Sequence, residues 1–196
     1  MQTIGGARRV VNRAQLPDRG IWDRPGFLVR RLHQIHVALF LEEVAGGEVT
    51  PIQYGLLTIL SMRPGIDQFT LGEELGLDRA NVAGILKRLE ARGWVRRVVD
   101  TDNRRRKLCV VTAAGKAFLN AHDREMQASQ QRLLAPLGAA ERERFLVLLA
   151  RLVEGNNDSG RAALRPGGKA FGEPGEAVTP TPLKPPTPTS RRGASR

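Results

Sequence analysis

Cysteine, histidine and tyrosine are scarce in this chain, and long apolar runs are missing. A single cysteine, Cys109, stands among 196 residues, so no internal disulfide can form, which agrees with a reducing compartment. No stretch reaches the roughly 18 consecutive apolar residues of a membrane span. The N-terminus is charged and lacks the apolar centre of a secretion signal. We therefore expect a protein of the bacterial cytoplasm.

Recognisable catalytic motifs are also missing. The chain has no glycine-rich phosphate loop, and no serine or cysteine stands in a nucleophile motif. His33 and His36 are three residues apart on one helical face, as metal ligands can be, but no Cys, Asp or Glu nearby completes a site. We interpret them as core or interface histidines. The sequence predicts no enzyme, no metal and no cofactor.

Acidic residues are too few to balance the basic ones. The chain has 31 Lys and Arg against 20 Asp and Glu, a formal charge of +11. Residues 156–196 carry a net +4 of this and residues 1–155 a net +7. Nucleic acid is the commonest partner for such an excess, and an anionic membrane surface is the alternative. The 41% of hydrophobic residues is enough for a core.

Composition divides the chain into three parts. Residues 1–22 form a basic arm, which we expect to be flexible. Residues 156–196 hold seven of the twelve prolines and few large apolar residues, so we expect a disordered basic tail. Residues 23–155 form the folded domain, with a central lobe at 48–112 and flanking helices within 23–47 and 113–155.

Helix signals are clear before the central hairpin. Asp23 and Pro25 suit the start of a helix that runs up to Gly46. The run 50–53 is a capping box with proline at the first helical position, and Thr70–Glu73 has the pattern of a second box. The first box predicts a helix up to Pro64, and the second predicts a short helix that ends at Gly76.

The period of the apolar residues then changes. Asp78 caps an amphipathic helix that ends near Gly93. Residues 94–99 and 107–111 are rich in β-formers and flank a polar, arginine-rich turn, which predicts a two-stranded hairpin. Thr112 caps a long helix up to about Leu134, and residues 139–154 form the last helix.

Two short helices followed by a basic hairpin are the parts of a winged helix-turn-helix. The second helix fits the major groove, where Arg79 suits guanine and Asn81 suits adenine. Hairpin arginines can lie over phosphates or enter the minor groove. The sequence therefore predicts DNA contacts by Arg79, Ala80, Asn81, Gly84, Lys87, Arg88, Asn103, Arg104, Arg105 and Arg106.

These motifs resemble the MarR family of transcriptional regulators. Residues 71–97, LGEELGLDRANVAGILKRLEARGWVRR, look like its helix-turn-helix, and residues 100–115 look like its wing and following helix. The resemblance covers residues 25–155. It implies a mainly α fold with a small β-hairpin wing, in which N- and C-terminal helices form a homodimer. It also implies a repressor of a pseudo-palindromic operator.

The wing departs from the family pattern at one position. Counted back from Thr112, the family's wing aspartate falls on Asn103, or on Asp102 if the turn is one residue longer. The sequence therefore does not show which residues, if any, form the Asp–Arg pair that stiffens the wing in the family.

The resemblance also implies a pocket for a small effector, often an aromatic acid. The block 24–36 is similar to a subgroup that includes regulators of aromatic-acid and nicotinate catabolism. By family position the pocket has an aromatic side and a basic side. Its expected residues are Arg31, His33, His36, Phe40, Tyr54, Thr58 and Met62.

Two other functions use the same features. A nucleoid-type protein would bind DNA through the same charge without sequence preference or effector. A partner-binding module would depend on the proline-rich tail. Some relatives sense oxidants through cysteine, but on the second hairpin strand we expect Cys109 to be an inert small side chain.

Overall fold

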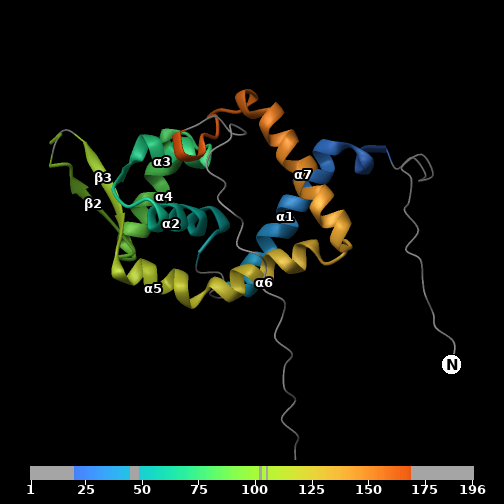
Figure 1. Cartoon of the computed structure of the whole chain (residues 1–196), viewed down its shortest axis with the longest axis horizontal. Helices are drawn as coiled ribbons and strands as arrows, with labels where there is room; N and C mark the ends of the chain where they lie inside the picture. The colour runs from blue at the N-terminus through green and yellow to red at the C-terminus, as the bar shows by residue number, and fades with distance from the viewer. Residues whose placement is uncertain (1–19, 45–48, 102, 105, 169–196) are drawn as a thin grey trace, which may run out of the picture.

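The computed structural model describes residues 20–44, 49–101, 103–104 and 106–168, and is mainly helical with a small sheet (Figure 1). The fold class predicted from the sequence is confirmed. Two short 3-10 turns follow the last helix, Asn157–Ser159 and Pro166–Gly168. In chain order the principal elements are α1 (Pro25–Glu43), α2 (Pro51–Met62), β1 (Ile66–Asp67), α3 (Gln68–Leu75), α4 (Arg79–Ala91), β2 (Val95–Val99), β3 (Lys107–Val111), α5 (Ala113–Ala121), α6 (Asp123–Leu134) and α7 (Ala139–Gly155).

Three predicted helix starts are confirmed by hydrogen bonds. At α2 the backbone N–H of Thr50 donates to the side-chain oxygen of Gln53 at 3.0 Å, and the Thr50 hydroxyl accepts from the Gln53 backbone, so the capping box is complete. Asp78 caps α4 by accepting from the backbone N–H of Asn81 at 2.9 Å. Thr112 caps α5 in the same way. Each cap satisfies a backbone N–H that the helix itself leaves without a partner.

The start of α3 differs from the prediction. The capping box expected at Thr70–Glu73 is wrong, because α3 begins three residues earlier at Gln68. Asp67 is the N-cap, and its carboxylate accepts from the backbone N–H groups of Phe69 and Thr70 at 2.9 and 3.0 Å. The Thr70 hydroxyl donates to the same carboxylate at 2.9 Å, so this threonine supports the cap instead of forming one.

Two smaller boundaries also differ. Arg24, not Asp23, occupies the N-cap position of α1. The long helix expected from Thr112 to Leu134 is divided between α5 and α6 at His122, whose φ and ψ of −110° and 13° leave the helical region. The first and last residues of the expected helix are nevertheless close to those observed.

The core of the lobe lies around α2. Leu56, Leu57 and Leu60 of this helix are all fully buried, and Leu86 and Leu89 of α4 reach the same cluster. A buried leucine contributes about 1.5–3 kcal/mol by leaving water. Burial of this side of α4 in the core therefore fixes which face of the helix points outward.

The sheet has three antiparallel strands in the order β1-β3-β2. The predicted hairpin pairs Val95 with Val111 and Val99 with Lys107. The short strand β1 adds to the other edge of β3 by pairing Ile66 with Cys109. The wing is therefore joined to the segment immediately before α3.

The first turn of α5 packs directly on the base of the hairpin. The backbone N–H of Thr112 donates to the carbonyl of Trp94 at 2.9 Å. A Cβ on Gly115 would lie 2.4 Å from the same carbonyl oxygen and 2.8 Å from a methyl group of Val111. Only glycine permits this approach, which sets the direction in which α5 leaves the lobe.

The remaining helices extend away from the lobe (Figure 1). α1 and α6 lie side by side, and Arg132 of α6 pairs with Glu42 at 3.0 Å and with Glu43 at 2.5 Å. No helix in the described part of the chain is long and apolar enough to cross a membrane. Large apolar side chains are exposed on the α7 surface, namely Leu146, Val147, Leu148, Leu149, Leu152 and Val153.

We expected residues 156–196 to be disordered, but residues 156–168 are folded. This stretch, which we call the C-terminal segment, returns to the lobe and packs on α3. Residues 169–196 of the expected tail and residues 1–19 of the expected arm lie outside the described residues.

Candidate nucleic-acid interface

α4 presents a basic face to solvent. Its apolar residues Val82, Ile85, Leu86 and Leu89 are buried, and the helical repeat turns the intervening residues outward. The structure brings the predicted contact residues of this helix together on that face. Arg79, Ala80, Asn81, Lys87 and Arg88 are exposed, and Gly84 is half-buried among them.

Asn81 already has a partner in the free protein. Its side-chain amide donates to the Asp78 carboxylate at 2.8 Å, while its backbone N–H donates to the other oxygen of the same group. An asparagine that reads adenine uses one N–H and the carbonyl oxygen. The bond to Asp78 occupies one of two amide hydrogens and fixes the orientation of the side chain, so bidentate base contact is compatible with it.

Gly84 leaves the middle of this face shallow. A Cβ at this position would meet only the tip of the Arg88 side chain, at 3.8 Å. The backbone of α4 can therefore come close to a base edge at Gly84, with Lys87 and Arg88 placed one turn further on.

The predicted wing contacts fall into two groups. Asn103 and Arg104 are exposed at the turn, whereas Arg105 lies outside the described residues, as does Asp102. Arg106 is tied to the lobe, with its guanidinium 2.5 Å from the Asp67 carboxylate and 3.9 Å from that of Asp100. An Asp–Arg pair does brace this wing, although its principal aspartate comes from β1 and not from the hairpin turn.

Asp67 holds the wing against α3, a contact that we did not predict. Burial would raise the pKa of its carboxyl, but hydrogen bonds from the Thr70 backbone, the Arg106 guanidinium and the Thr70 hydroxyl outweigh that effect and lower the pKa to about 2. Asp67 thus joins the start of α3 to the wing. An aspartate three residues before Thr70 was an available N-cap signal, but nothing local indicated Arg106.

A second ion pair anchors the other strand of the wing. Arg97 of β2 donates from Nε to Glu90 of α4 at 2.7 Å, and a second nitrogen of the same guanidinium contacts the second carboxylate oxygen. The contact with Arg97 lowers the pKa of Glu90 more than partial burial raises it. Wing and recognition helix are thereby held in one relative orientation.

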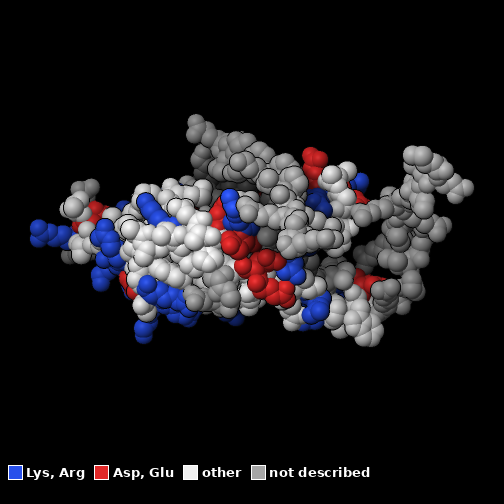
Figure 2. Space-filling model, turned by 90° about the horizontal axis from the view of Figure 1, so that it is seen from below, with Lys and Arg blue, Asp and Glu red and all other residues white. Residues whose placement is uncertain are grey.

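Charge is unevenly spread over the molecule. Figure 2 shows Lys and Arg side chains gathered at the end that carries the β2–β3 hairpin, whereas acidic side chains cluster near the middle of this face. The lobe end therefore attracts a polyanion most strongly.

The predicted effector residues separate into different surroundings. His33 lines a cavity of about 820 Å³ between α1, the start of α2 and the end of α4, together with Arg88 and Arg92. Tyr54, Thr58 and Met62 line another cavity of about 280 Å³ beside Asp123. The two groups do not form one pocket within a single chain.

A row of aromatic rings connects α1, α2 and α5. The rings of His36, Phe40, Tyr54 and Phe118 follow one another with centroids 5.8–6.5 Å apart, and Phe40 and Tyr54 are buried. Burial and the neighbouring His33 lower the pKa of His36. Arg31 is exposed on α1.

Cys109 is fully buried in β3. Burial raises the pKa of its thiol to about 11, although the nearby Arg97 acts in the opposite direction. Because the thiolate is the reactive form, this environment disfavours reaction of the cysteine at neutral pH.

Known proteins with the same arrangement are transcriptional regulators. Residues 48–106 match the MarR family. The HTH-type transcriptional repressor NicR of Pseudomonas putida is 28% identical over 140 residues, which are 71% of this chain and 89% of the relative. The crystal structure of the PcaV transcriptional regulator from Streptomyces coelicolor with its natural ligand is 35% identical, with a TM-score of 0.65, and the match covers 71% of this chain and 98% of that one.

A third similar structure is that of BpsR from Bordetella bronchiseptica, a protein whose DNA binding is regulated by 6-hydroxynicotinic acid. It is 26% identical, with a TM-score of 0.65, and the match covers 69% of this chain and 97% of that one. The helix-turn-helix, the basic wing and these matches together show that this chain belongs to the MarR family of transcriptional regulators.

Proposed function

We propose that this protein is a homodimeric repressor that binds a pseudo-palindromic DNA operator and leaves it when an aromatic carboxylic acid binds. The observation that carries the proposal is the exposed face of α4, where Arg79 and Asn81 precede Lys87 and Arg88, beside an arginine-bearing wing. The first pair lies where base edges would be read and the second where phosphates would be met. The protein would act in the cytoplasm and without catalysis.

Dimer formation is supported by the surface that one chain leaves uncovered. Besides the apolar residues of α7, Leu28, Val29 and Ile35 of α1 are exposed. A monomer rarely exposes so many large apolar side chains. A second copy would cover them and give the two recognition helices that a pseudo-palindrome requires.

Two features of the cavity lined by His33 suit an organic anion. It adjoins the start of α2, whose dipole favours negative charge, and Arg88 and Arg92 lie on its opposite wall. Because Arg88 also belongs to the DNA-facing surface of α4, an acid bound here would compete for this residue. Arg31, His36, Phe40 and the Tyr54–Met62 group would complete the site in the dimer.

Selection of bound duplexes from a random library tests the DNA part of the proposal. A repressor of this kind should enrich two inverted half-sites whose centres are about 10–10.5 base pairs apart. Enrichment of no sequence, with equal affinity for all duplexes at moderate salt, would instead indicate a nucleoid-type binder. Removal of residues 169–196 should leave DNA binding intact, and loss of DNA binding in that variant would show that the tail carries it.

The effector part is tested on the selected duplex. A panel of hydroxylated benzoates and nicotinates should include an acid that raises the thermal stability of the protein and weakens DNA binding. His33→Ala and His36→Ala should weaken this response, whereas Arg124→Gln on α6 should not. If no aromatic acid changes either quantity at millimolar concentration, regulation by such an effector is contradicted.

A further inference from the structure

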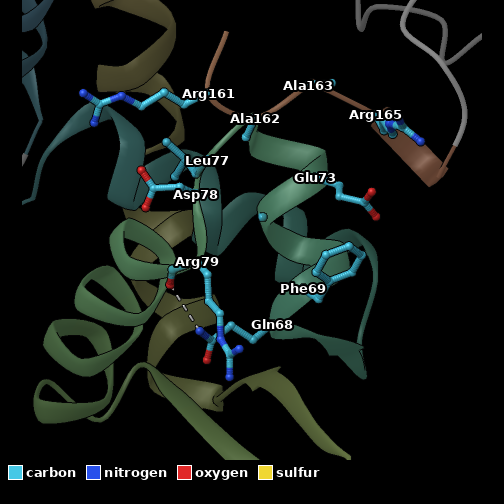
Figure 3. A pocket seen from close by; sticks show the side chains of 11 residues that line it. Gln68, Phe69, Glu73, Leu77, Asp78, Arg79, Arg161, Ala162, Ala163 and Arg165 are labelled. Atoms are coloured by element: carbon cyan, nitrogen blue, oxygen red, sulfur yellow. Dashed lines mark hydrogen bonds between the residues drawn. The ribbon is translucent and has the colours of Figure 1, made fainter. Parts of the chain in front are cut away.

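The C-terminal segment is folded onto the DNA-binding lobe (Figure 3). The side chain of Asn157 closes it into a loop by donating to the carbonyl of Leu164 at 3.0 Å and accepting from its N–H at 2.8 Å. The backbone N–H of Arg165 donates to the carbonyl of Glu73 in α3 at 2.7 Å. These bonds fix the backbone of the segment at both ends of the loop.

The end of α3 is shaped to accept the segment. Gly76 terminates the helix with a φ of +61°, a conformation that favours glycine. A Cβ there would lie 3.5 Å from Cβ of Leu164 and 3.7 Å from the carbonyl oxygen of Ala162. The segment therefore packs directly over the helix-turn-helix turn.

The docked segment places two arginines at the rim of a cavity that reaches the starts of α3 and α4. Arg161 and Arg165 border a cavity of about 350 Å³, together with Gln68, Phe69 and Arg79 at the starts of α3 and α4. Figure 3 shows that the segment crosses the C-terminal end of α3, whereas these three residues lie at the other end of the cavity. Arg161 lies near the turn between α3 and α4.

The same three residues connect this cavity to the wing. Gln68, Phe69 and Arg79 also border an adjoining depression whose other lining residues include Arg106 and Lys107. A continuous surface thus runs from the base of the wing, past the first residues of α3 and α4, to the C-terminal segment.

Acidic groups offset part of the charge of this surface. Asp78 and Glu73 line the first cavity and offset two of its three arginines. Asp67 lines the adjoining depression and pairs with Arg106. The Lys and Arg side chains of the two hollows still outnumber these carboxylates, so the surface remains cationic next to the start of α4.

From this geometry we infer that the C-terminal segment is a second DNA-binding element, whose Arg161 and Arg165 contact backbone phosphates flanking the groove occupied by α4. The inference rests on the proposed function. Arginines on a hydrogen-bonded backbone lose less conformational freedom on binding than arginines on a free tail. They would supply contacts that do not depend on base sequence but do depend on salt.

Salt dependence measures these contacts directly. The probe is a fluorescein-labelled random-sequence duplex of about 30 base pairs, titrated with the full-length protein over a series of salt concentrations. Each lost phosphate contact should reduce the slope of log K against log salt by about 0.9. We expect a reduction of about 1.8 for the double variant R161Q/R165Q, and none for the control R124Q.

A second variant tests the docking. Asn157→Ala keeps both arginines but removes the side chain that closes the loop, so it should weaken DNA binding at a given salt concentration while changing the slope less than R161Q/R165Q does. An unchanged slope in R161Q/R165Q, unchanged affinity in Asn157→Ala, or tighter binding by either variant would overturn the inference. Failure of the wild-type protein to bind DNA would instead overturn the proposed function as well.

Discussion

Asp67 connects α3 to the wing through one carboxylate. It caps α3, accepts the hydroxyl of Thr70 and pairs with Arg106 at the base of the wing. Because these contacts stabilise its ionised form, they lower the pKa to about 2 despite partial burial. The orientation of the wing therefore depends on the charge of this side chain.

Replacing Asp67 with asparagine should make this dependence visible. The folded-state pKa of about 2 lies below the ordinary value of 3.8, so the stabilisation is complete above about pH 5 and is lost as the pH falls toward 2. Asp67→Asn should lower the free energy of unfolding by about 1–2 kcal/mol at pH 7 and flatten its decline between pH 5 and pH 2.

Urea unfolding at several pH values measures both effects. Asp158→Asn, which changes an exposed aspartate of the C-terminal segment, serves as the control and should alter neither. Equal stability of Asp67→Asn and the wild type across this pH range would contradict the role assigned to Asp67.

Cys109 gives a second prediction for a single residue. Since it is fully buried and its pKa is raised to about 11, a thiol reagent such as DTNB should not react with the native protein at pH 8. The same reagent should modify one thiol per chain in guanidinium chloride. Rapid reaction of the native protein would show an accessible thiolate and reopen a redox role.

Residue-level predictions from the sequence succeeded where the signal was local. The caps at Thr50, Asp78 and Thr112 each depend on a partner three residues away, so the spacing alone revealed them. Asp67 and Arg106 are 39 residues apart in the chain. Their pairing requires β1 to lie beside β3, which no local pattern indicates.

At the scale of the secondary-structure elements, the wing contains an exposed arginine and an ion-paired one. Arg104 is exposed at the turn, whereas Arg106 is held by Asp67 and Asp100. Arg104→Gln should reduce the salt slope of DNA binding by about one unit and leave stability unchanged. Arg106→Gln should instead lower stability, because it leaves Asp67 without its cation.

Paired salt titrations and thermal melts of the two variants separate these effects. If Arg104→Gln left the slope at the wild-type value, the hairpin turn would not lie on the duplex, and the DNA-binding surface would have to be confined to α4 and its neighbours.

The fold of the C-terminal segment could not be predicted from amino-acid composition. Residues 156–168 share the small, polar character of the proline-rich residues that follow, and composition alone therefore assigned both to a disordered tail. The hydrogen bonds of Asn157 to Leu164 and of Arg165 to Glu73, and the fit over Gly76, depend on where α7 ends relative to α3. That relation is a property of the tertiary fold.

At the scale of the whole molecule, the exposed apolar surface of α7 predicts coupled folding and association. Leu149 is 37% exposed and Leu152 60% exposed in the single chain, and a second copy would bury both. Replacing the two leucines with glutamate should abolish the dimer and, with it, tight binding to a two-half-site duplex. Analytical ultracentrifugation and DNA titration measure these properties. A folded monomeric variant that binds as tightly as the wild type would contradict the dimer.

The arrangement of the residues expected at the effector site could not be predicted from sequence position. Family position gave seven residues, but the structure places His33 in one cavity and Tyr54, Thr58 and Met62 in another. Sequence position does not specify how α1 is rotated against α2, so it could not show that these residues line separate cavities within one chain.

The central claim is that α4 reads base sequence, and Asn81→Ala tests it most directly. Binding of the wild type and this variant is measured on the duplex obtained by selection and on a random duplex of equal length, after circular dichroism has confirmed that the variant is folded. Loss of a bidentate contact should cost about 1–3 kcal/mol on the selected duplex, a weakening of roughly 5- to 150-fold, with almost no change on the random one. Equal weakening on both duplexes, or none on either, would contradict sequence reading by this helix.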